Sequence, residues 1–162
     1  MKKTLSRRAK AISAVAAISL VTILATTALA LSNISLTLGS TEYDFGNGTP
    51  ISATVQIHEF NMKPGDTIPW HFHKASSYVI LKRGTLTETH YDPQTGQCHS
   101  EEVTAGNAFV EPPGLVHTVT NTGNGDAVIS WSTVFPKDDG IVEFTPSFKV
   151  GGVYLVQPPN CN

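Results

Sequence analysis

Beyond residue 31 the chain is a series of short runs rich in β-forming residues, and a turn signal separates each run from the next. No helical periodicity is sustained over this stretch. Short strands at such spacing, with glycine and proline at the breaks, are typical of an all-β sandwich or barrel. We expect the tail, 137–162, to be irregular and to wrap the barrel. The expected strands are 34–39, 51–60, 77–84, 85–91, 99–105, 107–113, 115–123 and 126–136.

The first 30 residues have the pattern of a secretory signal peptide. Residues 1–10 hold five of the eleven basic residues and no acid, and residues 11–31 carry no charge. The sequence Ala28-Leu29-Ala30 is the small-x-small pattern of a cleavage site. We therefore predict an exported protein, periplasmic or extracellular, with one domain over 31–162. An uncleaved anchor formed by residues 11–31 is the alternative, because that length can span a bilayer.

Removal of the signal would make the domain acidic. Residues 31–162 contain six basic groups and all thirteen acidic ones, so the formal charge is −7. A domain without a basic patch cannot neutralise phosphates, which argues against a nucleic-acid partner. A membrane contact is expected only through an uncleaved 11–31.

The two cysteines, Cys98 and Cys161, both lie in the exported part. An even number of cysteines in an oxidising compartment favours a disulfide, here between a mid-chain loop and the tail. Closing a loop of about 60 residues is worth roughly 4 kcal/mol on the chain-entropy view. We expect these thiols to be structural.

Histidines occur in two spaced elements. On a strand, the two-residue spacing of His71 and His73 directs both imidazoles to one face. Three imidazoles converge if the strands of the two elements face each other across a barrel. The first element is Gly65, five residues, His71-Phe72-His73, three residues, Ser77, six residues, Gly84; the second is Gly106, five residues, Pro112-x-Gly114, two residues, His117, three residues, Asn121.

These elements resemble the two motifs of the cupin superfamily, and the chain looks most like its small single-domain members over about 55–135. The resemblance implies a cupin-type β-barrel, or jelly-roll. It also implies a divalent transition metal (Fe, Zn, Cu or Ni) held by His71, His73 and His117. The family's glutamate ligand has no counterpart, because Ser77 stands in its place. A site of three histidines would bind hard cations such as Mn²⁺ less well.

Other residues could complete the ligand set or line the pocket. Glu88, on the strand after Gly84, and His58, on an earlier strand, are candidate fourth ligands. Glu111 is as readily placed at the barrel rim as inside it. Ser77 and Phe109 are expected at the pocket. The competing interpretation is that the histidines merely fill the barrel.

Two classes of function follow from the resemblance. The first is a metal-dependent, oxygenase-like enzyme acting on a small molecule, or a zinc hydrolase or isomerase as its variant. The second is a non-catalytic barrel that binds a small ligand or serves as a structural protein. The sequence leaves enzyme and binder both open. A homodimer is a further expectation, because small barrels with exposed edge strands often pair.

Overall fold

The computed structural model describes residues 32–145 and 148–161. The expected signal peptide, 1–30, and the alternative anchor, 11–31, lie outside these residues. The described residues form an all-β domain, as predicted. Within the described ranges, no helix is long and apolar enough to cross a bilayer.

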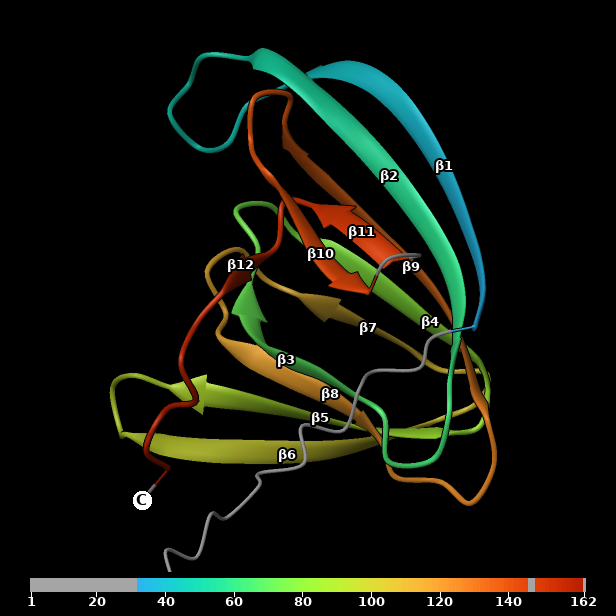
Figure 1. Ribbon diagram of the computed structural model, residues 1–162. Helices are drawn as coiled ribbons and strands as arrows, with labels where there is room; N and C mark the ends of the chain where they lie inside the picture. The colour runs from blue at the N-terminus through green and yellow to red at the C-terminus, as the bar shows by residue number, and fades with distance from the viewer. Residues whose placement is uncertain (1–31, 146–147, 162) are drawn as a thin grey trace, which may run out of the picture.

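Twelve strands make up the described part of the chain (Figure 1). The first six are β1 (Ser32–Tyr43), β2 (Ile51–Met62), β3 (Thr67–Phe72), β4 (Ser77–Arg83), β5 (Thr85–Asp92) and β6 (Gln97–Thr104). The others are β7 (Ala108–Glu111), β8 (His117–Asn121), β9 (Ala127–Pro136), β10 (Ile141–Thr145), β11 (Phe148–Gly151) and β12 (Tyr154–Leu155).

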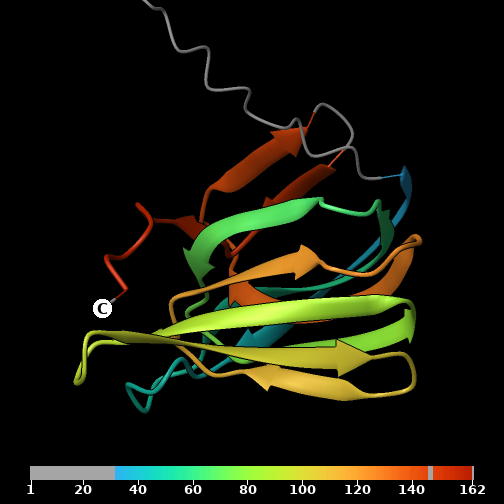
Figure 2. The same ribbon diagram turned by 90° about the horizontal axis from the view of Figure 1, so that it is seen from below.

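Two five-stranded sheets face each other, with strand orders β1-β2-β9-β4-β7 and β12-β3-β8-β5-β6. Neighbouring strands in both sheets run antiparallel. The view from below shows β3, β8, β5 and β6 side by side in the second sheet (Figure 2). The hairpin β10-β11 forms a small sheet of its own. This arrangement is consistent with the jelly-roll barrel that the motifs imply.

Alternation of apolar and polar residues places the core between the sheets. In β9 every second residue is buried, from Ala127 to Phe135. Successive side chains of a strand point to opposite faces, so this pattern buries one face of the sheet. The buried cluster takes Phe60, Leu81, Ile129 and Trp131 from the first sheet and Leu86, Val103 and Val119 from the second.

All eight expected strands are confirmed, as β1, β2 and β4 to β9. The prediction of an irregular tail is wrong, because the tail forms β10, β11 and β12. These strands are two to five residues long, too short to show alternation in sequence. Their stability comes from pairing: Tyr154 and Leu155 of β12 pair with Phe72 and His71 of β3.

The predicted disulfide between Cys98 and Cys161 is confirmed, across a sequence separation of 63 residues. Cys98 lies on β6 rather than in a loop. The disulfide fixes the end of the tail beside the second sheet (Figure 1). Since β12 also pairs with β3, the tail is attached to both edges of the second sheet: to β3, which carries His71, and to β6, which carries Cys98.

Candidate metal centre

The strand register brings the three histidines together. His71 on β3 is the direct cross-strand partner of His117 on β8. Residues opposite each other in an antiparallel pair point to the same face, and here that face is the barrel interior. His73 follows the last residue of β3. The three side chains are buried, with exposed fractions of 4% or less.

The three imidazoles form a compact group. One nitrogen from each of His71, His73 and His117 lies within 4.8 Å of the other two. The ring centroid of His71 lies 4.2 Å from that of His117 and 4.8 Å from that of His73. Among the histidine, cysteine and carboxylate side chains of the described residues, these three histidines form the group whose ligand atoms are close enough to hold one metal ion.

Backbone carbonyls fix the tautomer of all three rings. A carbonyl oxygen only accepts, so each Nδ1 that bonds to one must carry the proton. In the neutral ring, Nε2 is then left with a lone pair, the form that binds a metal. The acceptors are the carbonyls of Pro69 for His71 at 2.7 Å, Gly152 for His73 at 3.1 Å and Leu115 for His117 at 2.9 Å.

A buried carboxylate completes the group. Glu111 ends β7 and is 3% exposed, so it lies inside the barrel and not at the rim. Its Oε2 lies 3.3 Å from Nε2 of His73, and its Oε1 lies 3.1 Å from Nε2 of His117. Despite these distances, both Nε2 atoms and Oε2 lack a partner in hydrogen-bond geometry. The ring nitrogens are therefore not aimed directly at the carboxylate.

Burial and mutual charge set the pKa values of the group. The pKa of His71 is lowered to about 3, mainly by burial and to a smaller extent by the neighbouring His117 and His73. Burial alone would raise the pKa of Glu111, but its contacts with His117 and His73 outweigh burial and hold the pKa well below its usual range. For His117, burial is likewise outweighed by Glu111, and the pKa is raised. The group thus favours an ionised Glu111 with a positive charge beside it, which either a proton on His117 or a cation bound at the Nε2 lone pairs would supply.

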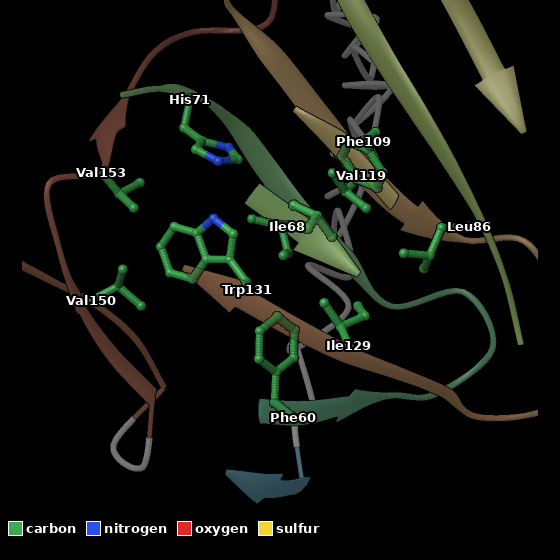
Figure 3. A pocket seen from close by; sticks show the side chains of 11 residues that line it. Phe60, Ile68, His71, Leu86, Phe109, Val119, Ile129, Trp131, Val150 and Val153 are labelled. Atoms are coloured by element: carbon green, nitrogen blue, oxygen red, sulfur yellow. The ribbon is translucent and has the colours of Figure 1, made fainter. Parts of the chain in front are cut away.

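A small apolar cavity of about 30 Å³ adjoins the histidines (Figure 3). The His71 ring points into it, facing Trp131 from the opposite sheet (Figure 3). One water-sized molecule needs roughly 10–15 Å³, so about two fit. Besides His71 and Trp131, the cavity is lined by Phe60, Ile68, Val79, Leu86, Phe109, Val119, Ile129, Val150 and Val153.

The remaining sequence-predicted residues are placed as follows. Phe109 lines the cavity, whereas Ser77 is buried opposite Glu111 and does not line it. Glu88 is buried on β5, and burial together with Glu111 raises its pKa to about 7. The His58 ring is stacked on Trp131, with 5.3 Å between the ring centroids, and its Nε2 contacts Oε1 of Gln56. Neither Glu88 nor His58 belongs to the three-histidine group.

The sequence left open whether Glu111 lies at the barrel rim or inside it, and did not make it a candidate ligand. Its signal was present, because strict alternation along β7 from Phe109, an expected pocket residue, sends Glu111 to the same face. The proline that follows suggested a strand end at the rim. A charged residue on the inward face, one residue before a turn, was the available clue.

Three comparisons place the chain among known proteins. The family described as "Cupin domain" matches residues 58–133. Germin-like protein 1-1 of Oryza sativa subsp. japonica is 31% identical over 75 residues, which are 46% of this chain and 35% of that protein. The chain therefore matches about a third of that relative's length.

Two solved structures are also similar. An oxalate oxidase in complex with the substrate analogue glycolate is 21% identical, with a TM-score of 0.44, and the match covers 62% of this chain and 54% of that one. A cupin superfamily protein from Desulfitobacterium hafniense DCB-2 is 14% identical, with a TM-score of 0.43, and the match covers 61% of this chain and 78% of that one.

Proposed function

The chain contains a cupin domain over residues 58–133, and from this premise we propose that the domain binds one divalent transition metal through His71, His73 and His117. The observation that carries the proposal is the set of three buried Nε2 lone pairs, fixed by Nδ1–H bonds to backbone carbonyls. The Nε2 atoms of His73 and His117 have no hydrogen-bond partner, and buried polar atoms left without partners are costly. A cation among the three rings would satisfy both of these atoms and would also bind His71.

The residues fit a transition metal by chemistry as well as by spacing. Imidazole suits Fe²⁺, Zn²⁺, Cu²⁺ and Ni²⁺. Two nitrogens bound about 2.1 Å from a common metal lie about 3.0–4.2 Å apart. The histidine nitrogens lie within 4.8 Å of one another, so small side-chain shifts bring all three to one ion. A metal held this way would supply Lewis acidity and, if it is iron or copper, redox chemistry. The carbonyl of Gly152 would hold the His73 ring in place.

We further propose that the domain is an oxygenase-like enzyme acting on a small molecule. Support comes from the cavity beside His71, which has room for about two water-sized molecules and is walled by apolar side chains. Apolar cavities of this kind stay dry and accept apolar guests, and dioxygen is one of that size. The apolar wall would exclude water, while His71 would be the polar group that the guest meets. A barrel that only binds its ligand would share these residues and lack turnover.

Export is proposed together with this activity. The Cys98–Cys161 disulfide supports an oxidising compartment, periplasmic or extracellular, since disulfides are rare in reducing ones. Residues 1–30 would supply the signal. Mass determination of protein recovered from medium or periplasm tests the expected cleavage after Ala30.

The test of the metal is its content in purified protein, measured by inductively coupled plasma mass spectrometry. We expect about one equivalent in the wild type and a loss of at least tenfold in His71→Ala and His117→Ala. His99→Ala is the matched control, because His99 is exposed on β6. Substoichiometric metal that none of these variants changes would contradict the proposal. Ligand-dependent uptake of dioxygen by metal-loaded protein would separate the enzyme from the binder.

A further inference from the structure

Ser77 and Glu111 occupy facing positions on neighbouring strands. They are direct cross-strand partners in the antiparallel pair of β4 and β7, and both are buried. Partners of this kind point to the same face, with Cβ atoms about 5 Å apart. A carboxylate on either residue would therefore enter the same region of the barrel. Ser77 is short, and its buried Oγ has no hydrogen-bond partner.

The distances around Glu111 are those between ligands of one metal. Two ligand atoms about 2.1 Å from a common ion lie about 3.0 Å apart at a bond angle of 90° and about 3.4 Å apart at the tetrahedral angle. The observed separations of 3.3 Å to His73 and 3.1 Å to His117 lie within this range. Distances alone would also suit ordinary ion pairs.

The directions distinguish the two cases. In an ion pair, the Nε2–H bond points at the carboxylate oxygen. Here Nε2 of His73 and of His117 miss that geometry, although the oxygens are close. Atoms that bind a common ion at right angles point at the ion and past each other, which gives close contacts with poor hydrogen-bond angles.

We infer that Glu111 is the carboxylate ligand of this centre and supplies from β7 the group that Ser77 cannot supply from β4. The inference rests on the proposed metal site. With Glu111 the ligand set is three imidazoles and one carboxylate, so a divalent ion leaves a net charge of +1. A carboxylate favours harder cations. Mn²⁺ and Fe²⁺ therefore become suitable occupants, in contrast to the expectation for three histidines alone.

The test is a titration of the full chain, stripped with EDTA, with MnCl₂ and, separately, with ZnCl₂. Free Mn²⁺ is followed by electron paramagnetic resonance and Zn²⁺ by calorimetry. Glu111→Gln keeps the shape of the side chain and removes its charge. We expect Mn²⁺ affinity to fall at least tenfold and Zn²⁺ affinity to fall less. Glu101→Gln is the matched control, because Glu101 is exposed on β6, and it should bind both ions as the wild type does.

A relocation variant carries the sharper prediction. Ser77→Glu combined with Glu111→Ser should recover Mn²⁺ affinity to within about threefold of the wild type, because both positions share one region. If Glu111→Gln binds Mn²⁺ as tightly as the wild type, the inference is overturned and the metal site stands. If the wild type binds neither ion, the proposed function itself fails.

An infrared measurement on the wild type needs no variant and so does not depend on how the variants fold. Addition of Mn²⁺ should shift the carboxylate stretching bands of one group in the difference spectrum. A centre held by histidines alone would leave those bands unchanged while the imidazole bands shift, and that result would also overturn the inference.

Discussion

The disulfide gives the most calculable prediction. Replacing both cysteines, Cys98→Ser with Cys161→Ser, opens a loop whose ends are 63 residues apart in sequence. The chain-entropy relation assigns about 4 kcal/mol at 25 °C to closing a loop of that length. For a domain of this size, such a loss lowers Tm by roughly 15 °C. The double replacement avoids the free thiol that a single one would leave.

The assay is equilibrium unfolding in urea, with EDTA present so that metal binding does not contribute. If the disulfide acts by restricting the unfolded chain, its removal leaves the folded tail docked. Hydrogen exchange checks this, because the amide of Val156 bonds to the carbonyl of Trp70 at 3.0 Å and should remain protected. A loss below 1 kcal/mol would refute the entropic account. A loss of the expected size with an unprotected Val156 would assign it to the native tail instead.

Three further outcomes are expected. Burial lowers the pKa of His58 from 6.5 to about 4, so the unfolded chain takes up a proton at a higher pH than the folded one. The free energy of unfolding should therefore fall between pH 6.5 and 4, by at most about 3 kcal/mol. Urea unfolding of His58→Gln at several pH values should lack this contribution to the pH dependence. Gly84 and Gly106 both have φ of +91°, so Gly106→Ala should lower the free energy of unfolding by about 1–2 kcal/mol. Gly84→Ala should cost at least about 1 kcal/mol more, because a Cβ at Gly84 would lie 2.8 Å from the Cα of Ala127. Thermal unfolding measures both costs, and equal values would contradict this. A divalent metal at a concentration of 100 Kd should stabilise the domain by about 2.7 kcal/mol, seen as a rise in Tm that EDTA reverses.

The fold was predictable where one face of a strand is buried and the other is not. Alternation and turn residues located eight strands, and the spacing of His71, His73 and His117 indicated that they would meet. The tail strands were missed because their stability comes from partners distant in sequence. Two residues of β12 carry no pattern of their own, yet they pair with β3.

The position of Glu111 shows the same limit within the site. Its contact with His73 joins residues 38 apart in sequence, so no local spacing rule connects them. The register between β4 and β7 decides that Glu111 faces Ser77. The motif alone predicts a carboxylate at position 77; in its absence, Glu88 and His58 were the candidate fourth ligands, and Glu111 was left between the rim and the interior. Knowledge of strand pairing would have pointed to Glu111 instead.

The facing pair Ser77 and Glu111 has a consequence for how related sequences vary. Two carboxylates in one buried region repel, and one of them would have to take up a proton. Positions 77 and 111 should therefore vary as a pair, with glutamate at one and a small residue at the other. Loss of a ligand at one position and its gain at the other would leave the centre intact in space while the linear motif disappears. A search written on both positions together would find such chains, and a search on the motif alone would pass over them.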